Sequence, residues 1–419
     1  MEEWKEYKVA EVIEEISMGP FGSNIKVDNF IDSGVPVLNG SNLQGFKLNE
    51  DSFNYVSQEK ADSLGKANAH RGDVVITHRG TLGQIIYIPE DSKYEQYVIS
   101  QSQFRLKLNK EIIRPDFFVY FFHTRLGQHR ILMNASQVGV PALARPTSTF
   151  KEVLVPVPPI DVQSKVMDIL HSLDDKIEVN RRINDNLEQQ AQALFKSWFV
   201  DFEPFRDGEF VESELGIIPK GWRVGILNEI AEITMGTSPS GASYNTIGTG
   251  DVFYQGRAEF GFRFPRRNMY TTEAKRFAEV DSVLVSVRAP VGDINVAEER
   301  CCIGRGLASV KSKSNYNSYI LYLMQSLKPV FDRFNGEGTV FGSINKKAFE
   351  EIQIIIPEEK VIAVFNPIIN CMDAQIRINE QESRRLAELR DTLLPKLMSG
   401  EIKVMNTDLI NEMLEKGIR

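Results

Sequence analysis

One stretch of this sequence occurs twice, and that repeat limits the possible folds more than any other feature does. Residues 150–199 align without a gap with residues 349–398, at a constant shift of 199 positions. The matched pairs include Phe150 and Phe349, Pro158 and Pro357, Asp174 and Asp373, Ile177 and Ile376, Asn180 and Asn379, Leu187 and Leu386, and Leu194 and Leu393. A weaker match precedes it, in which Trp4 recurs as Trp222. Because a repeat of about 200 residues is too long for a solenoid unit, the sequence predicts a duplicated globular domain followed by a long helix.

Length and composition place the chain among ordinary globular proteins. Its 419 residues predict two or three domains, and each half is large enough to bury its own core. There is no apolar run near the ~20 residues that a membrane-crossing helix needs, and no start typical of a signal peptide. The three cysteines, Cys301, Cys302 and Cys371, fit neither a disulfide framework nor a metal-ligand quartet. These observations predict a cytoplasmic protein without a metal site or a membrane partner.

The net charge of −8 argues against a uniformly basic nucleic-acid-binding protein, but the charge is unevenly distributed. The acidic excess falls mainly on residues 151–220, whereas residues 221–350 carry a slight basic excess. A locally basic face on the globular domains is therefore compatible with the composition.

The two globular segments have the pattern of α+β (mixed α/β) domains with many short strands. Runs of β-branched residues bounded by glycine or proline predict the strands. The expected elements are strands at 73–76, 84–88, 153–157, 282–287, 293–296 and 352–356, and helices at 117–122 and 319–327.

After each globular segment the apolar residues take up a heptad spacing. The seam positions are Leu173, Ile177, Asn180, Leu187 and Leu194 in the first copy, and Met372, Ile376, Asn379, Leu386 and Leu393 in the second. Steps that alternate between three and four residues over about four heptads are typical of a coiled coil. The alternative is two amphipathic helices that each pack only on their own domain, although the identical register favours helices that pair with each other.

Four residues qualify this prediction. The seam asparagines Asn180 and Asn379 are expected either to be buried and fix the register or to face solvent where the helices splay apart. Pro367 lies within the second seam, so we expect the second helix to begin near that residue or to kink there. Pro395 is expected to end that helix early or to bend it.

The order of the segments then predicts their arrangement. The first helix leads away from the first domain and the second helix leads back, so the helices should be antiparallel, with the domains at opposite ends. Forty helical residues span roughly 60 Å. The expected molecule is a two-helix spacer that separates two globular domains related by an approximate two-fold axis.

The sequence carries no recognisable catalytic motif. Gly65-Lys66 lacks the remainder of a phosphate-binding loop, no dinucleotide fingerprint follows a strand, and the five histidines form no HExxH motif. Residues 201–205 resemble the tetrapeptide of amino-methyltransferases only superficially. We therefore expect a binding protein with no catalytic residues and no cofactor of its own.

Polar and basic residues that suit nucleic-acid binding gather in the predicted loops. Arginine reads guanine edges, asparagine and glutamine read adenine, and lysine and serine hold phosphate. In the first domain the candidates are Ser23, Asn24, Lys26, Asn39, Ser41, Asn42, His78, Arg79, Thr81, Gln101, Gln103 and Arg145. In the second domain they are Thr237, Ser238, Ser240, Tyr244, Gln255, Arg257, Arg263, Arg266, Arg267, Arg288, Arg305, Asn345, Lys346 and Lys347. For any one of them, a solvated loop residue without a ligand is the commoner outcome.

Several motifs together resemble the specificity subunit of Type I restriction-modification enzymes. They are the openings EEISMG and AEITMG, the pair GDVVITHRGTLG and DSVLVSVRAPVG, the domain endings FKEVLVPVPP and FEEIQIIIP, the helical KIEVN and QIRIN, and the closing LLPKLMSGEI. The resemblance covers nearly the whole chain.

This resemblance implies two target-recognition domains that each read half of a split DNA sequence, joined by helices that bind methyltransferase subunits. The implied partners are double-stranded DNA, two methyltransferase subunits and the restriction-translocase subunits. S-adenosylmethionine and ATP would bind to those subunits and not to this chain. The predicted boundaries are recognition domains at 1–158 and 221–357, spacer helices at 159–200 and 358–400, a linker at 201–220 and a tail at 401–419.

The second domain is shorter by 18 residues and its loops differ, so the DNA target should be asymmetric. The charged faces of the helices are expected to meet the methyltransferase subunits, through Asp175, Glu178, Arg181, Glu188, Arg377, Glu380, Arg384 and Glu388. Two other functions remain open. Failure to bind DNA would favour a coiled-coil scaffold with protein-binding domains, and DNA cleavage or methylation by the chain alone would favour a self-sufficient nuclease or methylase.

Overall fold

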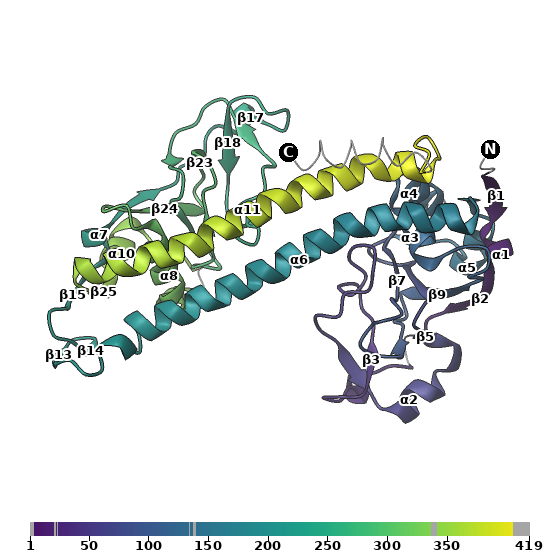
Figure 1. Cartoon of the computed structure of the whole chain (residues 1–419), viewed down its shortest axis with the longest axis horizontal. Coiled ribbons are helices and arrows are strands. Elements are labelled where there is room, and N and C mark those ends of the chain that lie inside the picture. The colour runs from purple at the N-terminus through teal and green to yellow at the C-terminus, as the bar shows by residue number, and fades with distance from the viewer. Residues whose placement is uncertain are drawn as a thin grey trace. The chain divides into compact units, whose positions relative to one another are not determined.

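The computed structural model describes residues 4–20, 22, 24–133, 135–136, 140–336 and 342–404. The chain forms two compact units, of which unit 1 comprises residues 1–177 and 384–419 and unit 2 comprises residues 178–383. Each unit contains one globular domain and a part of both long helices (Figure 1).

Two four-stranded sheets form the globular part of unit 1, in the orders β2-β9-β6-β7 and β4-β3-β8-β5. The strands are β1 (Lys5–Lys8), β2 (Ile13–Met18), β3 (Val35–Val37), β4 (Asn54–Val56), β5 (Asn68–His70), β6 (Val74–Thr77), β7 (Ile85–Tyr87), β8 (Gln96–Val98), β9 (Gln103–Leu108), β10 (Ala135–Ser136), β11 (Ala142–Leu143) and β12 (Leu154–Val157). The helices are α1 (Val9–Val12), α2 (Gln58–Ser63), α3 (Pro115–His123), α4 (Arg125–Leu132) and α5 (Pro146–Lys151).

Unit 2 repeats this plan, with a four-stranded sheet β16-β24-β21-β22 and a five-stranded sheet β17-β19-β18-β23-β20. The strands are β13 (Phe210–Ser213), β14 (Gly216–Pro219), β15 (Arg223–Ile226), β16 (Ala231–Met235), β17 (Tyr244–Asn245), β18 (Asp251–Tyr254), β19 (Tyr270–Thr271), β20 (Phe277–Ala278), β21 (Val283–Ser286), β22 (Ile294–Val296), β23 (Cys301–Ile303), β24 (Leu307–Ser312) and β25 (Gln353–Ile356). The helices are α7 (Leu227–Ile230), α8 (Asn317–Ser326), α9 (Lys328–Gly336) and α10 (Lys346–Glu350).

The central strand of each unit is buried on both faces. In β6, Val74 and Ile76 belong to the core that contains helix α3, whereas Val75 belongs to the core of the second sheet. In β21, Val283 and Val285 belong to the core with α8, and Leu284 belongs to the core of the second sheet. Successive side chains of a strand point to opposite faces, so a continuous apolar run predicts a strand covered on both sides. These strands, helices α3 and α8, and the mixed α/β class confirm the sequence prediction.

Two helices of 40 residues each, α6 (Ile160–Phe199) and α11 (Glu359–Met398), contribute to both units. In unit 1, Leu173 of α6 shares a core with Leu386 and Leu393 of α11. In unit 2, Asn180 donates to Ser383 Oγ at 3.3 Å, and Asn379 donates to Asn184 Oδ1 at 2.8 Å. Residues of increasing number along α6 thus contact residues of decreasing number along α11. The helices are therefore antiparallel in unit 2.

The seam residues are all buried or half-buried. Asn180 and Asn379 are 0% and 4% exposed, which excludes the solvent-facing alternative. Each helix portion also packs on the globular domain of its unit. The helices therefore both pair with each other and pack on the domains, and the two arrangements considered for the sequence occur together.

The expectation for Pro367 is wrong as far as the start of the helix is concerned, because α11 begins at Glu359 and continues through that residue. A proline removes one backbone hydrogen bond, to the carbonyl four residues earlier. That carbonyl belongs to the exposed Ala363, where water can replace the donor. The neighbouring Phe365 and Ile369 are fully buried and hold this part of the helix in place. Pro395 lies three residues before the end of the helix at Met398.

Among the described residues, one helix, α11, is long and apolar enough to be considered as a membrane span. Core helices of soluble proteins pass the same test, so this is weak support for a membrane segment. Phe365, Ile369 and Ile376 of α11 are fully buried within the protein, which accounts for part of its apolar character.

Candidate nucleic-acid interface

Five segments of unit 1 meet beside the sheet β2-β9-β6-β7, and we call them platform 1: the described residues of 19–26 (19–20, 22 and 24–26), 39–42, 78–84, 100–103 and 141–145. Backbone hydrogen bonds join them, from Gly19 N to Gln103 O at 2.8 Å, His78 N to Ser102 O at 2.8 Å and Leu143 N to His78 O at 2.9 Å. The Gln84 side chain donates to Gly40 O at 3.1 Å and ties in the remaining segment. Residues more than 100 positions apart thus form one surface.

Unit 2 contains the same arrangement, which we call platform 2: residues 236–240, 255–257, 287–292, 304–307 and 342–347. Gly236 N donates to Leu307 O, Val287 N to Gly306 O and Ile344 N to Val287 O, all at 2.9–3.1 Å. The Ser238 hydroxyl and the Gln255 amide are hydrogen bonded at 3.0 Å. The two platforms are therefore equivalent in their backbone connections.

A glycine at the same place in each platform permits a close approach of two chain segments. A Cβ atom on Gly19 would lie 2.0 Å from Ser100 O, and one on Gly236 would lie 2.2 Å from Gly304 O. Contacts below 3.0 Å with backbone atoms cannot be relieved by a side-chain rotation. Glycine is required at these positions because the loop after β2 or β16 must touch the turn before β9 or β24.

Arg79 and Arg145 in platform 1, and Arg288 and Arg305 in platform 2, are exposed and contribute positive charge. None of their side chains has a hydrogen bond or ion pair with another described residue. Arg145 has a left-handed backbone conformation (φ 46°) immediately before helix α5. Guanidinium groups that are free of internal partners are available to phosphates or base edges.

Other predicted cations of unit 2 already have acidic partners. Arg257 pairs with Asp293 at 2.5 Å and Arg267 with Glu299 at 2.6 Å, whereas Arg266 is exposed. Lys346 and Lys347 form longer pairs, at 3.5 Å and 3.8 Å, one turn along α10. These exposed pairs are weak enough to be exchanged for a phosphate contact.

Three predicted contact residues are buried, and their assignment to nucleic-acid binding is corrected. Asn42 is 1% exposed and its amide donates to Asn49 O and Ser52 O, which supports its own loop. Gln103 is fully buried and accepts from Ser100 N at 2.9 Å. Arg263 is 4% exposed and forms ion pairs with Glu188 and Asp373. Polar residues in loops can bond inward as readily as outward, so the sequence pattern did not separate the two cases.

The remaining predicted residues are placed as follows. Ser23 lies outside the described residues. Exposed residues are Asn24, Lys26, Ser41, Thr81, Gln101, Thr237, Ser240 and Asn345, and half-buried residues are Asn39, His78, Ser238, Tyr244 and Gln255. Asn39 and Asn345 also stabilise local turns, since Asn39 accepts from Ser41 N at 2.8 Å and Asn345 caps α10 at 2.9 Å. The sequence prediction missed Gln84, whose only signal was its place after the conspicuous Arg79 to Gly83 loop.

Burial lowers the pKa of His78 below its ordinary value of 6.5. His78 is therefore neutral near pH 7 and presents hydrogen-bonding groups without positive charge. Its Nε2 lies 3.2 Å from Gln101 O, which identifies Nε2 as the protonated nitrogen in this arrangement. The positive charge of platform 1 thus comes from lysine and arginine.

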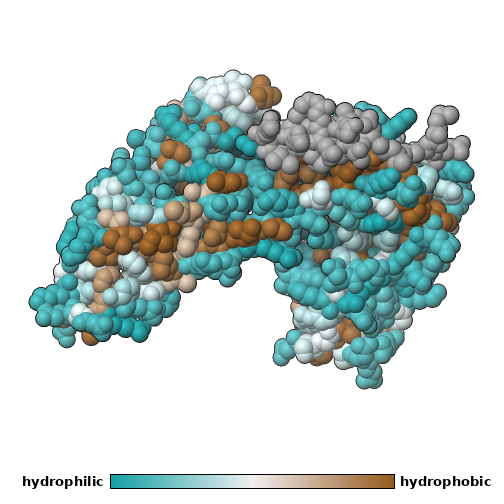
Figure 2. All heavy atoms as spheres, in the orientation of Figure 1, coloured by the Kyte–Doolittle hydropathy of each residue, from teal (hydrophilic) through white to brown (hydrophobic). Residues whose placement is uncertain are grey.

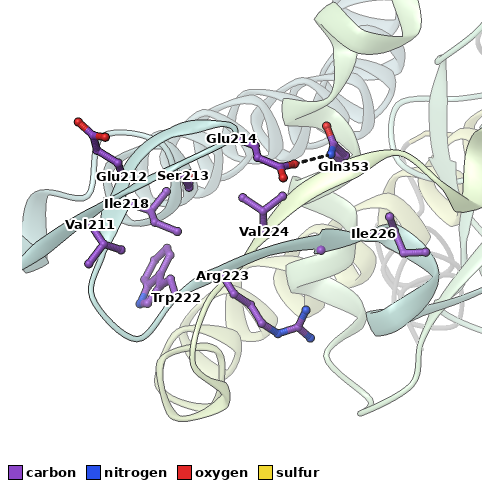
Figure 3. A pocket seen from close by; sticks show the side chains of 11 residues that line it. Val211, Glu212, Ser213, Glu214, Ile218, Trp222, Arg223, Val224, Ile226 and Gln353 are labelled. Atoms are coloured by element: carbon purple, nitrogen blue, oxygen red, sulfur yellow. Dashed lines mark hydrogen bonds between the residues drawn. The ribbon is translucent and has the colours of Figure 1, made fainter.

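A shallow pocket of about 400 Å³ in unit 2 has a different character (Figure 3). It lies between the β13–β14 hairpin and the β15–β25 pair, and Glu214 accepts a hydrogen bond from Gln353 at 3.1 Å across it. Glu212 and Glu214 outnumber the single cation Arg223 in its lining. This charge does not suit a phosphate backbone, so the platforms are the better candidate surfaces.

Comparisons with known proteins agree on one family. The family model described as "Type I restriction modification DNA specificity domain" matches residues 1–189 and 219–388. The putative type I restriction enzyme MjaX specificity subunit of Methanocaldococcus jannaschii is 29% identical, over 96% of this chain and 94% of that protein. The type I restriction enzyme HindI specificity subunit of Haemophilus influenzae is 25% identical, over 96% of this chain and 100% of that protein.

A solved structure supports the fold. The crystal structure of a Type I restriction-modification system S subunit from M. genitalium matches 94% of this chain and 96% of that chain. The two share 17% sequence identity with a TM-score of 0.56, which shows a similar fold and no more. Since the family model matches two segments that together make up most of the sequence, this chain belongs to the Type I restriction modification DNA specificity domain family.

Proposed function

We propose that this chain is the non-catalytic specificity subunit of a Type I restriction-modification complex, and that each platform reads one half of a split DNA target. The observation that carries this proposal is the recurrence of one five-segment platform, each copy with two exposed arginines free of described partners. Two similar reading surfaces in one chain suit a target made of two half-sites. The naming of the relatives as specificity subunits supports the same conclusion.

The two half-sites should differ in sequence. Platform 1 has His78 where platform 2 has Val287, and Ser102 where platform 2 has Gly306, although the backbone bonds at these places correspond. Different side chains on equivalent backbones present different donors and acceptors to base edges. An asymmetric, bipartite target follows from this proposal.

Helices α6 and α11 would set the distance between the half-sites. Forty residues of helix correspond to roughly 60 Å. We expect them to form one continuous antiparallel coiled coil, with the recognition domains (1–158 and 221–357) at opposite ends. The number of unread base pairs would then depend on helix length.

The methyltransferase subunits would bind the helices. Exposed apolar residues gather on the helix portions of unit 2, namely Val179 and Ile183 of α6 and Val364, Ile368 and Ile378 of α11 (Figure 2). Contiguous apolar surface of this kind is typical of a partner interface. Glu188 and Arg377 are less suitable than the sequence suggested, because they pair internally with Arg263 and Asp281. The restriction-translocase subunits would join this complex. S-adenosylmethionine and ATP would bind to the partner subunits. The complex would act in the cytoplasm.

The test is to co-express the chain with its methyltransferase partner and to sequence the methylated positions in host DNA. Methylation at one split, asymmetric sequence that disappears without this chain is the expected result. Unchanged methylation in its absence would reject the proposal. A chain with Arg79, Arg145, Arg288 and Arg305 replaced by alanine should assemble normally and lose the methylation, which separates DNA reading from assembly.

A further inference from the structure

Each unit contains one cluster in which a tyrosine, an aspartate and an arginine meet where the globular domain contacts α6 and α11. In unit 1, Tyr120 donates to Asp174, and Arg390 pairs with the same carboxylate at 2.6 Å. In unit 2, Tyr322 donates to Asp373 at 2.9 Å, and Arg263 pairs with Asp373. Asp174 and Asp373 are equivalent by the 199-residue shift, so the two clusters correspond.

The arginine, however, comes from a different part of the structure in each unit. Arg390 belongs to helix α11, and the equivalent residue 199 positions earlier is Ala191, which is fully buried. Arg263 belongs to a loop of the globular domain. Its backbone carbonyl accepts from Val296 N at 3.0 Å, just as the carbonyl of Phe46 accepts from Tyr87 N at 3.1 Å in unit 1. Phe46 therefore occupies the place of Arg263.

The arginine and its neighbours are matched within each unit, because the loop residue and the helix residues differ together. Phe46 stacks on Tyr120 with ring centroids 4.0 Å apart, and the guanidinium of Arg390 lies 4.9 Å from its ring. In unit 2 the arginine of the loop reaches helices that offer a second acid, Glu188, whose equivalent in α11 is Ala387. Unit 1 thus combines an aromatic loop with a cationic helix, and unit 2 combines a cationic loop with an acidic helix.

Mixing the two combinations would leave two acids without a cation in unit 2 and would place two guanidinium groups together in unit 1, where Arg390 also pairs with the exposed Asp391 at 2.8 Å. A domain with phenylalanine at the loop position would leave Asp373 and Glu188 without a cation if it packed on the helices of unit 2. A domain with arginine there would bring a second guanidinium beside Arg390 if it packed on the helices of unit 1. Removing one partner of a buried ion pair is strongly destabilising because the other charge stays desolvated.

We propose that this reciprocal exchange determines which globular domain packs on which part of the helix pair. The packing site of unit 1 is defined by Phe46, Ala387 and Arg390. The packing site of unit 2 is defined by Arg263, Glu188 and Ala191. The order of the domains is then fixed by side-chain chemistry as well as by chain connectivity. One consequence, a fixed order of the DNA half-sites, rests on the proposed function, whereas the packing rule does not.

The test rebuilds the unit 1 combination within unit 2 of the full chain. Hydrogen–deuterium exchange of residues 257–268 and of helix α8 reports local opening in the absence of DNA or partners. R263F alone should raise the opening equilibrium roughly 100-fold, because two acids lose their cation, and A191R alone should do the same by placing two arginines together. R263F/A191R should recover at least about half of the lost protection on a logarithmic scale, and R263F/A191R/E188A should recover more.

Arg206 provides a matched control, because it is exposed and pairs only with Glu203 among the described residues. R206F should leave exchange in these segments unchanged. If R263F does not fold and R263F/A191R does, the rescue is still demonstrated. A double variant no better protected than the worse single variant, or one that fails to fold while R206F folds, would overturn the packing rule. This measurement needs no DNA, so it can succeed when the methylation experiment fails, and the converse also holds.

Discussion

Platform 1 and platform 2 share their backbone contacts and differ in their side chains. Gly19 and Gly236 approach the facing turn in the same way. Equivalent residues, Gln103 and Leu307, accept the backbone hydrogen bonds of these two glycines. Gln103, by contrast, corresponds to Leu307. Main-chain bonds and glycine hold the loops in place, so the side chains between them can vary without loss of the framework. The backbone framework and the variable side chains are therefore separable parts of this fold.

The largest expected effect comes from exchanging one whole platform. If residues 221–350 are replaced by the segment of a relative, one half of the methylated sequence should change completely and the other half should stay the same. Sequencing of methylated DNA from cells with the hybrid chain measures this. A change in both halves would show that the platforms do not act independently.

A change in the helices should leave both half-sites intact and alter their separation. We would insert one heptad between Ile177 and Glu178 and another between Ser383 and Arg384, at the boundary of the units. Seven helical residues add roughly 10 Å, which is about three base pairs. The methylated sequence should keep its two parts with a longer spacer, and an unchanged spacer would refute the role of helix length. A heptad in α6 alone should impair folding, because the seam register is lost.

Gly236, which is equivalent to Gly19, should be more sensitive to substitution by alanine than the nearby Gly241. Gly236→Ala should lower the free energy of unfolding of unit 2 by about 2–3 kcal/mol, because the added methyl group meets Gly304 O. Gly241→Ala is the control, since a Cβ there meets nothing within 4 Å. Gly19→Ala should affect unit 1 to a similar degree. Urea unfolding of the full chain measures each, and equal effects of Gly236→Ala and Gly241→Ala would contradict the explanation.

Single arginines should separate base reading from phosphate binding. Arg79→Ala and Arg288→Ala should each weaken DNA binding of the assembled complex by about 1–3 kcal/mol if the side chain contacts a base. Relaxed specificity should then appear in one half-site for Arg79 and in the other for Arg288. A uniform loss across sequences, with a smaller salt dependence, would indicate phosphate contacts instead. Arg206→Ala, an exposed arginine outside both platforms, should have no effect on either quantity.

The smallest effect concerns pH and distinguishes the units at equivalent positions. Burial lowers the pKa of His123 below its ordinary value of 6.5, and the corresponding residue of unit 2 is the non-titrating Gln325. Because the unfolded chain binds this proton more readily, the contribution of His123 is fully present above about pH 6.5 and is lost as pH falls toward its folded pKa. His123→Gln should reduce the loss of unit 1 stability between pH 7 and pH 5, because glutamine takes up no proton. Thermal unfolding at both pH values measures it, and an unchanged pH dependence would contradict this account.

The elements of the fold were largely predictable because their signals are local. Val74 to Thr77 and Val283 to Ser286 are continuous apolar runs, and the heptad spacing marks α6 and α11. The start of α11 was mispredicted at Pro367, since a proline weakens a helix by one bond and buried neighbours such as Phe365 outweigh that loss. Local sequence signals predicted an element correctly where no tertiary contact opposed them.

The candidate site was less predictable, because a polar loop residue gives the same sequence signal whether its partner lies inside or outside the protein. Arg79 and Arg263 are both arginines beside glycine or aromatic residues, yet Arg79 is exposed and Arg263 is buried between two acids. The partner of Arg263 on α11 is 110 positions away. No local pattern identifies such a partner.

The duplication, the buried strands, the two long helices and the family can all be recognised from the amino-acid order, because repeats and hydrophobic periods are local properties of the chain. The amino-acid order also contains the differences between Ala191 and Arg390 and between Glu188 and Ala387, as mismatches in a gapless alignment. Their relation to Phe46 and Arg263 becomes visible in the folded protein. Only folding brings a loop of the globular domain against a distant helix, where desolvation makes one missing or surplus charge costly.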